Sequence, residues 1–150
     1  MIQESALAYA HLLALLSLVV FLSSEAALCR AEWMNEAVVR RLGRLDLIYR
    51  LSALVVLLSG LARIYGGMKG SDWYWGNPWL HAKLGLLVVI AALSLGPTRM
   101  FIRWRRTLDA GGGLPSPDEV RRARRLVMWQ AHLLALVPVA GVVMARGFGA

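Results

Sequence analysis

The sequence predicts an all-α fold, an integral membrane bundle in which four helices each cross the bilayer. Three observations support this prediction. The 150-residue chain is 58% hydrophobic with a mean hydropathy of +0.55, which is more apolar than a water-soluble domain of this length. Its apolar residues form four runs, at about residues 5–24, 45–65, 79–96 and 126–145, and arginine concentrates in two of the segments between them. We expect a single transmembrane domain over residues 1–150.

Each apolar run is long enough to span a membrane as a helix. A helix rises about 1.5 Å per residue, so about 20 residues cross a hydrocarbon core roughly 30 Å thick. The first run follows the segment MIQES, which has an acidic residue and no basic one, whereas a secretory signal peptide begins with a basic segment. We therefore interpret the first run as a retained span. The single cysteine, Cys29, excludes an intramolecular disulfide.

Local signals predict where several helices begin, bend or end. The segment SPDE from Ser116 has the pattern of a capping box, so the fourth helix is expected to begin about nine residues before the membrane. The second helix is expected to begin near Asn35. Gly96-Pro97 is predicted to end the third helix, and Pro138 is predicted to kink the fourth, because proline lacks a backbone donor and clashes with the preceding turn.

The distribution of basic residues predicts the orientation. Four arginines lie between the first and second runs and eight between the third and fourth, whereas the loop between the second and third runs has Lys69 alone. Basic residues collect on the cytoplasmic side of bacterial inner-membrane proteins, so both termini and the loop 66–78 are expected on the periplasmic side. The net charge of +8 then reflects topology and anionic headgroups, and nucleic acid is not an expected partner. Most of the aromatic residues in and beside this loop are interpreted as a membrane-interface belt: Trp73, Tyr74, Trp75 and Trp79.

Two of the three histidines are expected at one level near the outer surface. His11 lies about six residues inside the first run and His81 two or three residues inside the third. Two neutral imidazoles that face each other can bind the iron of a b-type haem, so both are candidate metal ligands. Arg63, Lys83 and Lys69 can meet the porphyrin carboxylates. The alternative for His81 and Lys83 is a pair of interfacial side chains that contact water or headgroups.

Other ionisable residues are interpreted as architectural. His132 belongs to the cytoplasmic half of the fourth run, where we expect a hydrogen bond between helices. Asp46 and Arg50 are expected to pair along the second helix, and Glu25 to pair with Arg50 or Arg44. A heptad stripe on the first run is expected to face inward: Glu4, His11, Leu18 and Glu25.

The segments AYAHLLAL, RLGRLDLIYRLSALVVLLSGLARI, NPWLHAKLGL and RWRRTLDAGGGLP resemble a bacterial four-helix inner-membrane family known only as a domain of unknown function. More distantly, the chain resembles the HemJ-type protoporphyrinogen IX oxidases, which share a histidine in helix one and a WLHxKL opening of helix three. This second resemblance implies that His11, His81 and Lys83 occupy positions used for haem or substrate. The chain lacks the Tyr-His pair late in helix three and the Asn-Glu-x-Pro stretch in helix four of those oxidases.

Three functions are compatible with these features. The leading hypothesis is a b-type haem-binding or porphyrin-handling protein with a redox role, in which His11 and His81 are axial ligands and Arg63 and Lys83 bind carboxylates. The alternative is a non-enzymatic scaffold or accessory subunit, in a homo-oligomer or larger membrane complex, whose arginine-rich face binds anionic lipid or a partner protein. A third is a proton or small-solute pathway along the inward stripe of the first helix. The sequence contains no complete catalytic set, and this favours the non-enzymatic alternative. Whether the protein is an enzyme is therefore left open at this point.

Overall fold

The structure, a computed structural model, describes residues 2–67 and 70–147, and over these residues it contains helices and no strands. The elements are α1 (Ile2–Leu28), the 3-10 turn η1 (Ala31–Trp33), α2 (Glu36–Gly66), α3 (Ser71–Gly76), α4 (Pro78–Asp109) and α5 (Pro117–Ala145). The four long helices are each long and apolar enough to cross a membrane. The predicted fold class is therefore confirmed.

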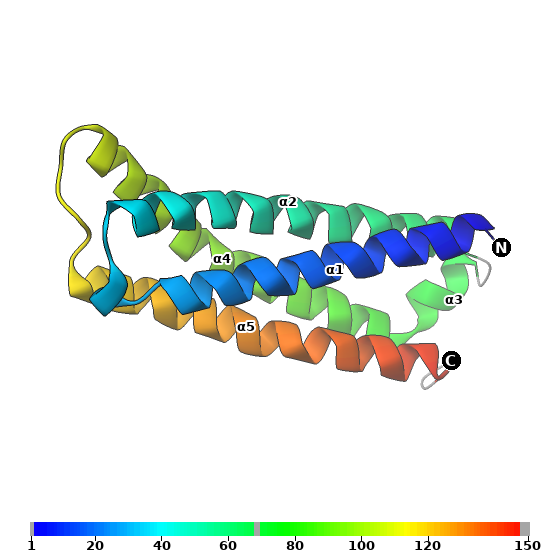
Figure 1. The fold of residues 1–150 in the computed structure, drawn as a ribbon. Coiled ribbons are helices and arrows are strands. Elements are labelled where there is room, and N and C mark those ends of the chain that lie inside the picture. Colours follow the sequence, from blue (N-terminus) through cyan, green and yellow to red (C-terminus); the bar gives the residue numbers. More distant parts are fainter. Residues whose placement is uncertain (1, 68–69, 148–150) are drawn as a thin grey trace.

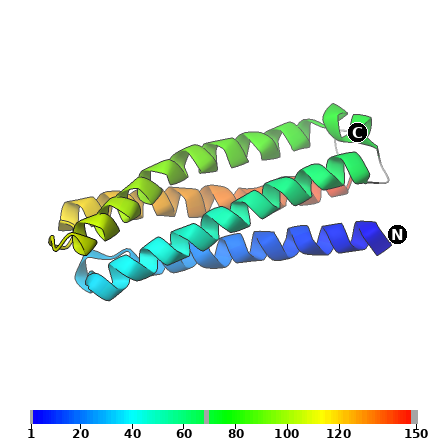
Figure 2. The ribbon, with the colours of Figure 1, turned by 90° about the horizontal axis from the view of Figure 1, so that it is seen from above.

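The four long helices form an up-down-up-down bundle. The hairpin α1–α2 packs beside the hairpin α4–α5, with α2 against α4 and α1 against α5. Both chain termini and α3 lie at one end of the bundle, here called the α3 end (Figure 1). The α1–α2 and α4–α5 connections lie at the opposite end, here called the η1 end, and the view from above shows the same arrangement (Figure 2). Short connections make consecutive helices antiparallel neighbours.

The bundle has an apolar interior and an apolar exterior. The main buried cluster includes Leu18 and Leu22 of α1, Phe101 of α4 and Leu134 of α5. Large apolar side chains are also exposed on the outward faces of the long helices, among them Leu16, Leu54, Leu58, Val88 and Val139. A water-soluble monomer rarely exposes apolar surface on this scale, whereas lipid covers it at no cost.

Two of the expected helix starts are confirmed. Ser116 Oγ accepts a hydrogen bond from Glu119 N at 3.3 Å, and Glu119 Oε2 accepts one from Ser116 N at 3.2 Å, which completes the capping box of α5. Asn35 Oδ1 accepts from Val38 N at 3.0 Å and caps α2. α5 then continues through Pro138.

The prediction that Gly96-Pro97 ends the third helix is wrong. α4 continues through Pro97 to Asp109. Proline removes one backbone hydrogen bond, but the next turns bury Thr98, Phe101 and Trp104 in the bundle, and this burial offsets the loss. The segment between α2 and α4 also contains the short helix α3, and α4 begins at Pro78, where Asn77 Oδ1 accepts from Trp79 N at 2.9 Å.

Candidate functional site at the α3 end

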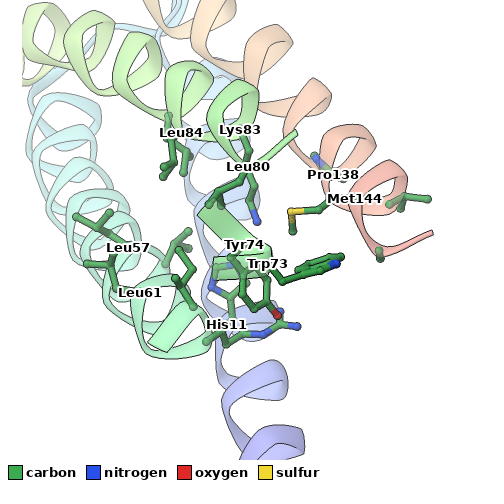
Figure 3. Close-up of a pocket in the computed structure, with 18 of the residues that line it drawn as sticks. His11, Leu57, Leu61, Trp73, Tyr74, Leu80, Lys83, Leu84, Pro138 and Met144 are labelled. Atoms are coloured by element: carbon green, nitrogen blue, oxygen red, sulfur yellow. The ribbon is translucent and has the colours of Figure 1, made fainter. Parts of the chain in front are cut away.

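A pocket of about 470 Å³ lies at the α3 end, among all four long helices and α3. Ligand sites in proteins have volumes of about 300–1,000 Å³. Most of its wall is apolar, and Figure 3 labels five of the apolar lining residues: Leu57, Leu61, Leu80, Leu84 and Met144. Its charged or imidazole groups come from Glu4, His11, Arg63 and Lys83, and Trp73 and Tyr74 add an indole and a phenol. The pocket therefore combines an apolar body with a few convergent polar groups, as binding sites commonly do.

Small residues and a break between two core clusters leave room for this pocket. The main core cluster ends near Tyr49, Ile90 and Val137, and a second cluster around Ile64, Tyr74 and Leu80 closes the α3 end. On the wall, a Cβ on Gly60 would lie 3.4 Å from His11 Cε1. A methyl group at position 60 would therefore touch the imidazole, and glycine keeps this part of the wall open.

His11 is the polar centre of the pocket. Its side chain is 7% exposed, and its Nδ1 lies 2.8 Å from Ser59 Oγ. Ser59 Oγ lies 2.6 Å from the carbonyl oxygen of Val55, which can only accept. The hydroxyl hydrogen is therefore given to that carbonyl, and the hydroxyl oxygen accepts from His11 Nδ1–H. In a neutral imidazole this tautomer leaves the lone pair on Nε2.

Two cations line the same pocket. Arg63 comes from α2 and Lys83 from α4, and both are partly buried. Figure 3 shows the Lys83 side chain extending from α4 toward the interior of the pocket. Both charges lie near enough to His11 to act on it electrostatically. Over residues 2–67 and 70–147, neither cation forms an ion pair, so the pocket has positive charge to offer a ligand.

The structure brings His11, Arg63 and Lys83 together, but it does not place His81 with them. His81 is exposed and does not line the pocket. Its Nε2 lies 2.9 Å from the carbonyl oxygen of Trp75, so Nε2 donates and is engaged at the α3–α4 turn. Lys69, the other cation expected here, lies outside the described residues.

Two of the aromatic residues predicted for the interface belt, Trp73 and Tyr74, also line the pocket, whereas Trp75 and Trp79 are exposed. α3 is amphipathic, since it buries Tyr74 and exposes Trp75, and this pattern is the signal that could have placed Tyr74 in the pocket. His132 Nδ1 donates to Met128 O at 2.6 Å, within its own helix, and so does not join two helices as expected.

A second polar group lies deeper in the bundle, toward the η1 end, and we call it the carboxyl cluster: Glu25, Asp46, Tyr49, Thr98 and Gln130. The expected pair of Asp46 with Arg50 is confirmed, with Arg50 Nε at 3.0 Å from Asp46 Oδ2. The expected ion pair of Glu25 is wrong: among the described residues it pairs with neither Arg44 nor Arg50, because Arg50 is directed to Asp46.

The inward stripe of α1 is confirmed, but its polar members are separated. His11, Leu18 and Glu25 are buried, and Glu4 is partly buried. Between His11 and Glu25 the interior is filled by an apolar layer: Leu18, Leu22, Leu134 and Val137. The structure therefore holds two polar regions divided by packed side chains, rather than one polar path across the membrane.

Within the described part of the chain, no three or more His, Cys, Asp or Glu residues form a group that could hold a metal ion. In comparison with known proteins, a family model described as "Predicted membrane protein (DUF2214)" matches residues 3–149. No curated protein and no solved structure matches the chain significantly. The expected resemblance to HemJ-type oxidases therefore has no support from these comparisons.

Proposed function

We propose, for a chain that belongs to the DUF2214 family of predicted membrane proteins, a role in binding an amphipathic carboxylate within the membrane. The observation that carries this proposal is the pairing of Arg63 and Lys83 around one largely apolar pocket. A carboxylate accepts charge-assisted hydrogen bonds from both side chains, while the apolar walls cover the body of the ligand. Neither cation has a competing ion pair among the described residues.

A porphyrin is the carboxylate amphiphile that best uses His11 as well. The hydrogen bond from Nδ1 to Ser59 orients the imidazole and leaves Nε2 for a metal, which is how proteins commonly hold a ligand histidine. The residues therefore fit haem b through one axial ligand, His11, with Arg63 and Lys83 at the carboxylates. A second axial bond from His81 requires that side chain to leave the Trp75 carbonyl.

Titration of the detergent-purified protein with two probes separates iron ligation from carboxylate binding. Haemin is expected to give a shifted Soret band that His11→Ala abolishes. Metal-free protoporphyrin IX, followed by fluorescence, is expected to bind wild type and His11→Ala alike. Arg63→Gln and Lys83→Gln are each expected to lower the affinity for both probes about 10- to 100-fold, since a hydrogen bond to a charged group contributes about 1.5–3 kcal/mol.

Two control variants lie at the same end of the bundle and outside the pocket. His81→Ala changes a histidine that is bonded to a backbone carbonyl, and Arg146→Gln changes an exposed cation at the end of α5. Both are expected to bind like wild type. If neither probe binds, or if the Arg63 and Lys83 variants bind as tightly as wild type, the proposed function is wrong.

We further propose that the α3 end faces the periplasm of a bacterial inner membrane, because the arginines gather at the η1 end. In a Cys29→Ala background, Ser71→Cys marks the α3 end and Gly113→Cys, where a Cβ meets no atom within 4 Å, marks the α4–α5 loop. In intact cells stripped of their outer membrane, an impermeant maleimide is expected to label position 71 at once and position 113 only after permeabilisation. The reverse pattern would contradict this orientation.

A second candidate function is a scaffold or accessory subunit that binds anionic lipid at the η1 end. A smaller pocket of about 330 Å³ there is lined by Arg30, Arg121 and Arg124, with Glu32 as its acidic member. Native mass spectrometry with phosphatidylglycerol and phosphatidylcholine tests this role. Preferential retention of the anionic lipid, lost in Arg121→Gln, would support it, and equal retention of both lipids would count against it.

A further inference from the structure

The carboxyl cluster places two acidic side chains in the interior of a membrane bundle. Glu25 of α1 and Asp46 of α2 are each 2% exposed. Thr98 of α4 and Gln130 of α5 complete the group, so all four long helices contribute to it. Ionisable residues within membrane spans are costly, because an unpaired charge loses its hydration there. Two buried carboxyl groups so close together therefore raise the question of which of them is charged.

Asp46 has the partners that a carboxylate needs. Thr98 Oγ1 donates to Asp46 Oδ1 at 2.6 Å, and Arg50 Nε donates to Asp46 Oδ2 at 3.0 Å. The Arg50 side chain is 43% exposed and brings a positive charge to the buried oxygen. Each oxygen of Asp46 thus accepts a hydrogen bond, one of them charge-assisted, and the group can stay ionised.

Glu25 has no equivalent support. Its Oε1 atom is buried and has no hydrogen-bond partner, and Glu25 forms no ion pair in the part of the chain that the structure describes. It nevertheless interacts electrostatically with Asp46, Arg50 and Tyr49, so it belongs to the same cluster. Arg50 is the described cation that acts electrostatically on Glu25, and it is already bonded to Asp46.

We propose that Glu25 and Asp46 form a proton-binding site, in which Glu25 holds the proton and Asp46 holds the negative charge. Two neighbouring carboxylates in a medium of low polarity repel each other, and Arg50, the cation that acts on both, is bonded to Asp46. Asp46 is stabilised as an anion by Thr98 and Arg50, so the proton is assigned to Glu25. This site is independent of the ligand pocket, because the apolar layer of Leu18, Leu22, Leu134 and Val137 separates them.

The groups that surround the site come from every packed helix. Tyr49 of α2 donates its hydroxyl to Gln130 Oε1 at 3.2 Å, and Gln130 Nε2 donates to Leu126 O at 3.3 Å. These neutral groups are therefore occupied with each other. On α5, Arg124 donates to the carbonyl oxygen of Ala26 at 2.6 Å and so caps the end of α1 rather than Glu25.

The site lies nearer the η1 end than the α3 end, because Glu25 is one turn before the end of α1. A metal ion is a poorer occupant, because no group of three or more His, Cys, Asp or Glu ligands occurs among residues 2–67 and 70–147. The hydroxyl of Thr98 and the amide of Gln130 also already have partners.

Infrared spectroscopy of the protein in lipid bilayers at neutral pH tests this assignment. A protonated carboxyl group has a carbonyl stretching band that an ionised carboxylate lacks. We expect wild type to show this band and Glu25→Gln to lose it. The matched control Glu4→Gln, at the partly buried carboxyl of the α3 end, is expected to retain it unshifted.

If Glu25→Gln fails to fold, isotope labelling of the wild-type protein identifies which carboxyl group carries the proton. Carboxyl-labelled glutamate is expected to shift the band of the wild-type protein, and carboxyl-labelled aspartate is expected to leave it in place. The absence of a protonated carboxyl band in wild type would overturn the proposal, as would a band that survives Glu25→Gln or that moves with labelled aspartate.

Discussion

Replacing Thr98 with valine removes one buried hydrogen bond and leaves the shape of the side chain nearly unchanged. Thr98 Oγ1 donates to Asp46 Oδ1 at 2.6 Å, and both residues are buried. A hydrogen bond to a charged group contributes about 1.5–3 kcal/mol. Asp46 keeps its bond to Arg50 at 3.0 Å, so we expect the lower part of this range rather than the larger cost of a fully unpaired charge. The expected loss in the free energy of unfolding is about 2 kcal/mol, or roughly 30-fold in the unfolding equilibrium.

Reversible unfolding in mixed micelles of mild detergent and sodium dodecyl sulfate measures this loss. Thr98→Ser is the matched control, because it keeps the donor and removes one methyl group, at a cost of about 1 kcal/mol. In a double-mutant cycle, Thr98→Val is expected to cost less in an Asp46→Asn background, where the acceptor is no longer charged. Equal stability of the valine and serine variants, or strictly additive effects with Asp46→Asn, would refute the account of this hydrogen bond.

Three further outcomes are expected. Ser116→Ala removes the capping side chain of α5 and is expected to lower the free energy of unfolding by about 1 kcal/mol. Ser116→Thr keeps a capping hydroxyl and is expected to keep most of this stability, so equal losses in the two variants would contradict the capping role. Tyr49→Phe removes the bond to Gln130 Oε1 and is expected to cost about 0.5–1.5 kcal/mol in the same assay, so a stabilised variant would count against that bond. Burial raises the pKa of the Cys29 thiol to about 12, so the folded protein holds little thiolate and is expected to react with iodoacetamide far more slowly than the denatured chain; comparable rates would show that the thiol is accessible.

Rules that act within one or two turns of a helix made much of this fold predictable. A stretch of about 20 apolar residues must satisfy its backbone internally in lipid, so the four spans follow from composition. The capping segments at Asn35 and Ser116 begin their helices because the side chain reaches a backbone amide three residues away. The bond between Asp46 and Arg50 follows from the same local geometry, since residues four apart share a helix face.

The tertiary structure decided which side chains oppose one another. His11 and Ser59 are 48 residues apart, and Asp46 and Thr98 are 52 apart, so no local pattern indicates either contact. His81 contacts the carbonyl oxygen of Trp75 because the segment before α4 forms the helix α3, which brings that carbonyl to the imidazole. Pro97 remained within α4 because the turns that follow it are buried. Local chemistry thus determined where each helix begins and ends, with Pro97 as the exception. The rotation and packing of the helices determined which side chains line the pocket and which form the carboxyl cluster.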